Sequence, residues 1–239
     1  MLNAVNPWRD LPSAAPFVLS CDATAIEEFH AGDPPAWHRL HLELLPEPFL
    51  GRPYAPVVLL NLNPGFNDQD VLAHENGELA EAATRNLVHA QQRYPSYLRD
   101  PRFREASGAR WWRTHLAQLL ARFGDSRVAN AIACVEYFPY HSDNYGFPTE
   151  LPSQRYSIEL VRSAIGRGAV IVVLRAWSLW TAALPELAQY ARAFKLRNRQ
   201  RVWVTEDNCP DGFATIAAAI EESTACGKGR AHSPNVPAP

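Results

Sequence analysis

A run of six apolar residues, Ala169-Val-Ile-Val-Val-Leu174, constrains the fold of this chain more than any other feature. A strand that is apolar on both faces is typical of the centre of a parallel sheet, where helices cover both sides. The run is far shorter than the roughly 20 residues that cross a bilayer, and so is the run at residues 57–60. We therefore expect an α/β protein with no membrane partner.

Three other segments read as strands, and helical patterns separate them. The strands are expected at residues 57–62, 131–136, 169–174 and 201–205, and the helices near residues 75–93, 111–123, 153–167, 176–193 and 211–222. Strands that alternate with helices form parallel sheets through right-handed crossovers. The pattern predicts a three-layer α/β/α sandwich with a four-stranded parallel sheet in the order 2-1-3-4, with the switch point between the first and third strands.

The length of 239 residues suits one domain with a single large core. Residues 1–54 are expected to form an irregular acidic lead-in packed on that core, with one short helix near Asp22 to His30 and Asp22 as its N-cap. Residues 55–222 form the predicted α/β/α domain. Residues 223–239 are small, polar and proline-rich, so we predict a disordered tail.

Composition excludes several classes of protein and of site. With 47% hydrophobic and 20% charged residues, the chain is neither disordered nor fibrous. Its beginning has no cationic start and no continuous apolar stretch, so we expect a cytoplasmic protein. The four cysteines contain no C-x-x-C pair, and His38, His41 and Glu43 lack a further ligand nearby, so no metal and no cofactor is predicted.

Asn63-Pro64-Gly65-Phe66 is the sharpest candidate for a binding site. Parallel α/β sheets bind ligands beyond the carboxyl ends of their strands, and this segment directly follows the first predicted strand. The amide of Asn63 can hold a water or the polar edge of a ring, and Gly65 lets a ligand approach backbone N–H groups. The alternative is that the segment is only a turn that ends a strand. Signatures of dinucleotide binding, P-loops and serine hydrolases are absent from the sequence.

Residues 58–65, Val-Leu-Leu-Asn-Leu-Asn-Pro-Gly, resemble the strand-plus-G-[IL]-N-P-G motif of the uracil-DNA glycosylase superfamily, in particular its mismatch-specific uracil and thymine branch. The similarity covers about residues 55–222 and implies that the loops after the first and fourth strands face each other across a nucleobase pocket. It also implies that Asn63 positions the hydrolytic water and that Gly65 accompanies a tight backbone approach. The chain departs from the family where Asn61 replaces the leading glycine of the motif. Asn208-Cys209-Pro210 only echoes the second family motif, a His-Pro-Ser or Asn-Pro-Ser loop.

Cleavage of an N-glycosidic bond needs a held water on one side of the sugar and hydrogen-bond donors for the departing base on the other. On this interpretation Asn63 holds the water, and Asn208, the backbone after it, or His141 faces the base. Phe66 and Tyr140 lie in loops that can supply an aromatic platform for a flipped base. The alternative for each aromatic residue is ordinary packing.

Glu136 ends the second predicted strand and is the carboxylate expected in the same crevice. It can act as a general base or read the edge of a base. The alternative is a salt bridge with Arg175 at the end of the third strand. We predict that Asn63, Glu136, Tyr140, His141, Arg175 and Asn208 surround one cleft, with Gly65 and Phe66 beside them.

The charge pattern leaves the partner open. Residues 93–113 hold six arginines and residues 192–201 hold four arginines and one lysine, which suits contacts with phosphates. The acidic run at residues 68–81 disfavours a DNA backbone beside the same turn. Three functions therefore stand: a nucleobase N-glycosylase acting on DNA, a non-catalytic module that binds nucleotides or nucleic acid, and a relative that binds another small molecule.

Overall fold

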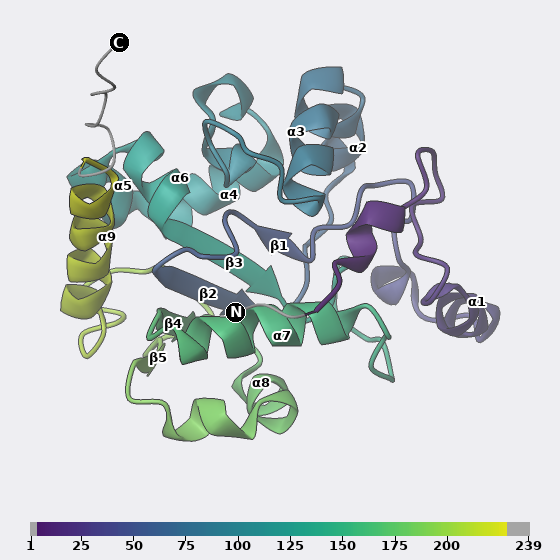
Figure 1. The fold of residues 1–239 in the computed structure, drawn as a ribbon. Coiled ribbons are helices and arrows are strands. Elements are labelled where there is room, and N and C mark those ends of the chain that lie inside the picture. Colours follow the sequence, from purple (N-terminus) through teal and green to yellow (C-terminus); the bar gives the residue numbers. More distant parts are fainter. Residues whose placement is uncertain (1–3, 229–239) are drawn as a thin grey trace, which may run out of the picture.

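A five-stranded, mostly parallel sheet forms the centre of the computed structural model, which describes residues 4–228 and side chains to residue 223 (Figure 1). The strands lie in the order β1-β3-β2-β4-β5. Their bounds are β1 Phe49–Leu50, β2 Val57–Asn61, β3 Ile132–Glu136, β4 Val170–Val173 and β5 Ala193–Lys195. Strands β3, β2, β4 and β5 are parallel, and β1 pairs antiparallel with β3. The α/β class is confirmed, but the prediction of four strands is wrong.

The additional strand, β1, lies in the segment expected to be an irregular lead-in. Phe49 and Leu50 pair with Val135 and Cys134, and Gly51 then turns the chain with a φ of 95°. A strand of two residues carries no detectable alternation, so only its pairing partner reveals it. The lead-in thus contributes an edge to the sheet.

The fourth strand of the parallel set is β5, not residues 201–205. Val202 and Val204 are buried while Arg201 and Trp203 are exposed, which is the alternation that suggested a strand. The backbone of this segment bonds elsewhere: the Val204 N–H donates to the carbonyl of His115, 2.8 Å away. The alternating burial therefore arises in a loop that packs on a helix.

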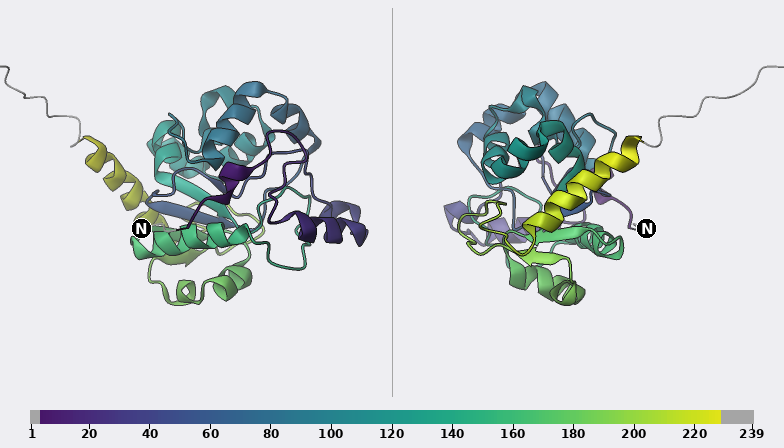
Figure 2. Two further views of the ribbon diagram at one scale, coloured as in Figure 1. Left: turned by 45° about the vertical axis from the view of Figure 1, so that its right-hand side comes forward. Right: turned by 90° about the vertical axis from the view of Figure 1, so that its left-hand side faces the viewer.

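Helices cover both faces of the sheet (Figures 1 and 2). Helices α7 and α8 lie on one side, and helices α3 to α6 lie on the other. Their bounds are α1 Ala23–Ala31, α2 Asp68–His74, α3 Gly77–Leu87, α4 Ser107–His115, α5 Ala117–Phe123, α6 Asp125–Ala131, α7 Gln154–Gly166, α8 Trp177–Ala183 and α9 Phe213–Lys228. Short 3-10 turns occur at Pro7–Asp10, Ala36–His38, Tyr97–Arg99, Pro101–Phe103 and Pro185–Gln189. Helix α9 continues beyond residue 222, where the sequence suggested its end, and residues 229–239 of the predicted tail lie outside the described residues.

The N-terminal helix forms where it was predicted, but Asp22 does not cap it through its side chain. The Asp22 carboxylate is fully buried and instead accepts hydrogen bonds from the Tyr140 hydroxyl, at 2.8 Å, and from the Ser153 N–H, at 3.0 Å. Asp22 therefore ties the lead-in to the loop and the helix that follow β3.

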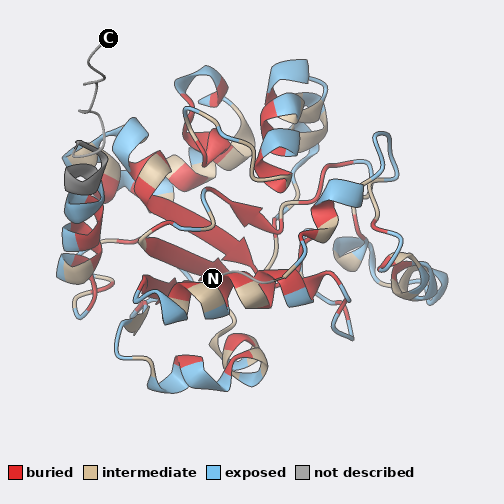
Figure 3. Ribbon diagram, viewed as in Figure 1, coloured by how far each residue is buried: buried red, intermediate tan, exposed pale blue. Residues whose placement is uncertain are grey.

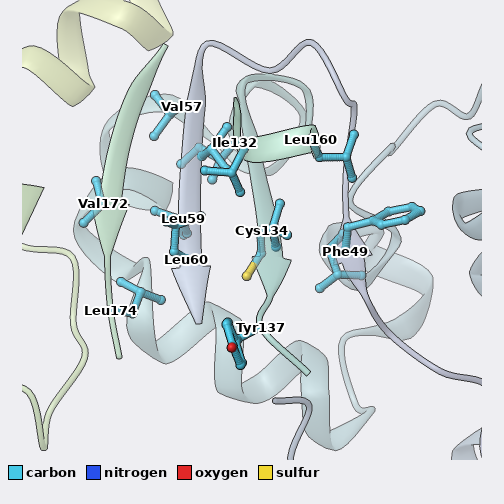
Figure 4. Close-up of a cluster of buried hydrophobic side chains, with 14 of the residues drawn as sticks. Phe49, Val57, Leu59, Leu60, Ile132, Cys134, Tyr137, Leu160, Val172 and Leu174 are labelled. Atoms are coloured by element: carbon cyan, nitrogen blue, oxygen red, sulfur yellow. The ribbon is translucent and has the colours of Figure 1, made fainter. Parts of the chain in front are cut away.

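The core lies on both sides of the central strands (Figure 3). Every residue of β2, β3 and β4 is buried, and all are apolar except Asn61 and Glu136, which end β2 and β3. Figure 4 shows Leu59, Ile132 and Val172 packed across neighbouring strands, with Tyr137 just beyond the end of β3. Packing of this kind fixes the register of β2 against β3 and so the positions of the residues that follow each strand.

No helix in residues 4–228 is long and apolar enough to cross a membrane.

Candidate functional site

A cleft of about 340 Å³ opens at the carboxyl ends of β2 and β3 and beside the residues that follow β4. This volume falls within the range of about 300–1,000 Å³ that is usual for small-molecule sites. Its wall is built from the turn after β2, helix α2, the 3-10 turn at Tyr97–Arg99, helix α4 and the segments after β3 and β4. The lining residues are Glu47, Asn61, Asn63, Pro64, Gly65, Phe66, Asn67, Asp70, Ala73, His74, Leu79, Tyr97, Leu98, Ala106, Ser107, Gly108, Trp111, Trp112, Glu136, His141, Asp143 and Arg175.

Most of the side chains predicted for the site line this cleft, and two do not. Asn63, Gly65, Phe66, Glu136, His141 and Arg175 are lining residues, whereas Tyr140 and Asn208 are not. The six come together because parallel strands end at one edge of the sheet.

Tyr140 is a structural residue in the core. Its hydroxyl donates to Asp22 and accepts a hydrogen bond from the Leu19 N–H, at 3.2 Å. Burial and the neighbouring Asp22 carboxylate raise the pKa of Tyr140 far above its usual value. With its ring and hydroxyl both inside the protein, Tyr140 offers no platform for a ligand.

Asn208 organises a loop outside the cleft. Its Nδ2 donates to the carbonyls of Arg201 and Trp203, both at 2.8 Å, and its Oδ1 accepts from the Asn198 N–H at 2.7 Å. The Asn208-Cys209-Pro210 segment, which resembles the second family motif, therefore stabilises a backbone turn. Asn208 does not line the cleft and does not face Asn63 across it.

Asn61 and Glu136 form the floor of the cleft. They are direct partners in the β2–β3 register, and Asn61 Nδ2 donates to Glu136 Oε1 at 3.1 Å. The side chains are 7% and 3% exposed, respectively. Asn61 Oδ1 and Glu136 Oε2 are buried and have no hydrogen-bond partner among the described residues. Buried polar atoms without partners are costly, so this pair points to a ligand or water in the cleft.

The electrostatic environment keeps Glu136 protonated at neutral pH. Burial raises its pKa from 4.5 to about 8, the nearby Glu47 carboxylate adds to the rise, and the hydrogen bond from Asn61 opposes it. Glu47 itself has a pKa raised to about 7 by burial, against the hydrogen bond from the Tyr97 hydroxyl at 2.8 Å. At pH 7 Glu136 thus favours the neutral form, whereas Glu47, with a pKa near the pH, is present in both forms.

The alternative role for Glu136, a salt bridge with Arg175, is not observed. No ion pair joins the two side chains in the part of the chain that the structure describes, and Arg175 is exposed just after β4. Arg175 therefore stands at the mouth of the cleft as a cation with no carboxylate partner among the described residues.

Asn63 sits at the rim and is held by the loop that follows β3. Its Nδ2 donates to Ser142 Oγ at 3.1 Å, to the Ser142 carbonyl at 3.2 Å and to the Pro64 carbonyl at 3.0 Å. Asn63 Oδ1 makes no hydrogen bond to any described residue. The amide is thus fixed in orientation, with its acceptor oxygen left to bind a water or a ligand donor.

His141 braces the same loops. Its Nδ1 lies 2.7 Å from the carbonyl of Gly65, and its Nε2 lies 3.1 Å from the carbonyl of Leu45. Burial lowers the pKa of His141 to about 4, so the ring is neutral at pH 7 and donates from one nitrogen only. Both nitrogens face backbone carbonyls, and the predicted role of His141 as a donor to a ligand base is therefore not available in this geometry.

Aromatic side chains form the walls. Phe66 stacks on His41 with ring centroids 3.2 Å apart, and Trp111 stacks on His115 at 3.7 Å. Trp112 meets Trp111 edge-on. Trp111 and Trp112 begin the segment that the sequence predicts as a helix; Trp112 is buried, whereas Trp111 is half-buried, and both line the cleft.

Several polar lining residues were not predicted. Glu47 enters from the lead-in, where its N–H donates to the carbonyl of Pro139 at 2.9 Å beside β1. Asp70 and His74 come from α2, whose N-cap Asn67 accepts from the Gln69 N–H. The acidic run after the Asn-Pro-Gly turn was the available signal for Asp70. Nothing local in the sequence marks Glu47.

Among the described residues, no group of three or more His, Cys, Asp or Glu side chains is arranged to hold a metal ion.

No protein-family model, no curated protein and no solved structure matches this chain.

Proposed function

We propose that this protein binds a nucleobase in the cleft and hydrolyses an N-glycosidic bond, as a distant member of the uracil-DNA glycosylase-like proteins with their three-layer α/β/α fold. One observation carries the proposal. Asn61 Oδ1 and Glu136 Oε2, two unpartnered polar atoms on adjacent strands, lie on the floor of an aromatic-walled cleft. A neutral carboxyl donates and an amide oxygen accepts, and this pair complements the adjacent acceptor and donor on the edge of a nucleobase.

The walls suit a planar ring. Phe66 and Trp111 both line the cleft, each with one ring face stacked on a histidine, and aromatic rings stack on bases with little regard for their identity. The hydrogen bond between Asn61 and Glu136 fixes both side chains before a ligand enters. A pocket organised in this way spends little binding energy on ordering its side chains.

The chemistry assigns Glu136 as the acid. The bond from the sugar carbon to the base nitrogen breaks with its electron pair going to the base, and the neutral Glu136 carboxyl protonates the base as it leaves. Asn63 Oδ1 orients the water that bonds to the sugar carbon. That water releases its proton to solvent, and solvent reprotonates Glu136, so one water is consumed in each cycle.

The first test measures base release. Purified protein is incubated with single-stranded and mismatched oligonucleotides that contain uracil or another altered base, and free base is detected by mass spectrometry. Glu136→Gln and Asn63→Ala should each lower the rate by about 10²-fold or more, because each removes a group that acts in the transition state. The rate should also fall as the pH rises through about 8, where Glu136 loses its proton.

Glu159→Gln is the matched control, since Glu159 is a glutamate on α7 that pairs with Arg162 and does not line the cleft. It should leave the rate unchanged. If the wild-type protein releases no base from any substrate of the panel, the hydrolase proposal is wrong.

A non-catalytic nucleobase-binding module is the second candidate, and the position of Asn208 favours it. The counterpart of the second family motif does not line the cleft, so it adds no polar group to those of Asn61 and Glu136 on the floor. Calorimetric titration with free nucleobases and nucleotides separates the candidates. Binding that Glu136→Gln weakens, without base release, supports the module, and the absence of any binding points to another small molecule.

A further inference from the structure

The two arginine-rich stretches of the sequence have different surroundings in the folded chain. In residues 93–113, most of the arginines are buried or neutralised. Arg99 is buried against Trp112, Arg102 pairs with Asp100 and Glu78, Arg110 with Glu105, and Arg113 with Asp125. This stretch has little free positive charge to offer a partner.

The second stretch, Arg192 to Arg201, is fully available. Its five cations are exposed, and none forms an ion pair with any residue that the structure describes. Arg201 lies over the ring of Trp203, 5.5 Å from its centroid, and Trp203 is 40% exposed. We call residues 197–203 the cationic loop.

The conformation of the cationic loop is fixed from inside. Asn208 holds it by hydrogen bonds to the Asn198 N–H and to the carbonyls of Arg201 and Trp203, and the Arg197 N–H donates to the carbonyl of Asn208 at 2.8 Å. Val202 is fully buried beneath it. The ordered backbone of the loop therefore holds Arg197, Arg199, Arg201 and Trp203 in place. Binding of a partner then costs little conformational entropy for ordering the loop.

The cationic loop lies next to the wall of the cleft. The Val204 N–H donates to the carbonyl of His115, whose ring stacks on the cleft residue Trp111. One turn of α4, about 5.4 Å, separates Trp111 from His115. Arg175 follows β4 and Arg197 follows the neighbouring strand β5, and Arg175 also lines the cleft. Positive charge thus runs along one edge of the sheet from the cleft to the loop.

We propose that the cationic loop binds the sugar–phosphate backbone of a single-stranded nucleic acid, with a base stacked on Trp203. Arginine forks pair with phosphates, and an exposed indole stacks on an unpaired base. An acidic protein surface, the alternative partner, could pair with the arginines but would offer no planar group to stack on Trp203. The acids that follow the loop, Glu206, Asp207 and Asp211, lie outside residues 197–203, so the cationic loop itself contains positive charge alone.

The test is fluorescence anisotropy with a labelled single-stranded 20-mer, in DNA and RNA forms, between 50 and 200 mM salt. The variant Arg197→Gln/Arg199→Gln/Arg201→Gln should bind about 100-fold more weakly near 0.1 M salt, because each lost phosphate contact forfeits the release of about 0.7 counterions. For the same reason, the slope of log K against log salt should fall by about 2. Trp203→Ala should weaken binding by about 10-fold and leave the slope unchanged.

The matched control carries the same loss of charge elsewhere. Arg104, Arg127 and Arg155 are exposed arginines outside both the loop and the cleft, and none belongs to an ion pair among residues 4–223. Arg104→Gln/Arg127→Gln/Arg155→Gln should bind as the wild type does. Replacing the three loop arginines by lysine should keep the salt slope.

Any of three results would overturn the inference. The first is that neither the DNA nor the RNA strand binds at 50 mM salt, and the second is that the control triple variant weakens binding as much as the loop variant does. The third is tighter binding to polyglutamate or to anionic vesicles than to the oligonucleotide. The inference does not rest on the proposed function, and the two fail separately. Strand binding that Glu136→Gln leaves intact, without base release, supports the loop and refutes the hydrolase. Base release from wild type that the loop variant leaves unchanged, with equal strand binding, refutes the loop.

Discussion

Replacing Glu136 by glutamine gives a direct test of its protonation state through the stability of the protein. The pKa of Glu136 is about 8 in the folded protein, and its ordinary value is 4.5. Between these values the folded state keeps a proton that the unfolded state has released. Wild-type stability therefore falls as the pH rises, by about 1.4 kcal/mol per pH unit from this group. Glutamine is neutral at every pH and removes this dependence.

The magnitude follows from the same two values. From pH 5 to pH 7, the free energy of unfolding of Glu136→Gln should rise relative to that of the wild type by about 2 kcal/mol. His89 and His141 have pKa values lowered to about 4 by burial, so they act with the opposite sign over much of this range. Those terms are common to both proteins and cancel in the difference, which is why the comparison uses a variant and not a single curve.

The assay is urea unfolding at 25 °C, followed by tryptophan fluorescence at pH 5, 6 and 7 and analysed by linear extrapolation. Glu159 is a half-buried glutamate on α7 that pairs with Arg162, and Glu159→Gln should show no comparable pH-dependent gain. A difference between wild type and Glu136→Gln that stays constant within about 0.5 kcal/mol from pH 5 to 7, about a quarter of the expected change, would show that Glu136 ionises normally in the fold. The assignment of Glu136 as a proton donor would then be withdrawn.

Three further substitutions test the architecture around the cleft. Tyr140→Phe should lower the free energy of unfolding by about 1.5–3 kcal/mol in urea titrations, because the buried carboxylate of Asp22 loses a hydrogen bond. Asn208→Ala should speed amide exchange across residues 197–203, seen by mass spectrometry, while leaving exchange in β2 unchanged. Gly51→Ala should cost about 1–3 kcal/mol, measured as a lower urea midpoint, since Gly51 has a φ of 95° and an added Cβ would lie 3.0 Å from the carbonyl oxygen of Ile132.

The central strands could be predicted because their signal is local. Residues 57–60 and 170–173 are apolar on both faces, and both lie in the middle of the sheet, where both faces are buried. The segment at 201–205 shows the limit of this reasoning. Its alternation reports the burial of Val202 and Val204, and burial in a loop against a helix produces the same pattern as burial in a sheet.

The positions of site residues could be predicted where the residue ends a strand or follows it closely. Asn63 and Glu136 follow or end strands whose direction the crossover rule already fixes, and both line the cleft. Glu47 was missed because its position depends on the pairing of β1 with β3, between residues more than 80 apart in the chain. Asn208 was misplaced for a related reason. It was expected directly after a strand at residues 201–205, whereas the fourth parallel strand is β5, which ends more than ten residues before Asn208.

The acidic and basic residues that line the cleft come from different elements, and this bears on how the proposed nucleic-acid strand would approach it. On the wall formed by α2 and its neighbours, Asp70 accepts from Ser107, and beyond it Glu78 is paired with Arg102. Arg175 follows β4 and lines the cleft with no carboxylate partner among the described residues, and the cationic loop follows the neighbouring strand β5. We therefore expect the acidic run at residues 68–81 to disfavour a phosphate backbone beside α2 but not beside Arg175. On the proposed function, we expect a nucleic-acid strand to reach the cleft past Arg175 and the cationic loop, with its phosphates near these cations.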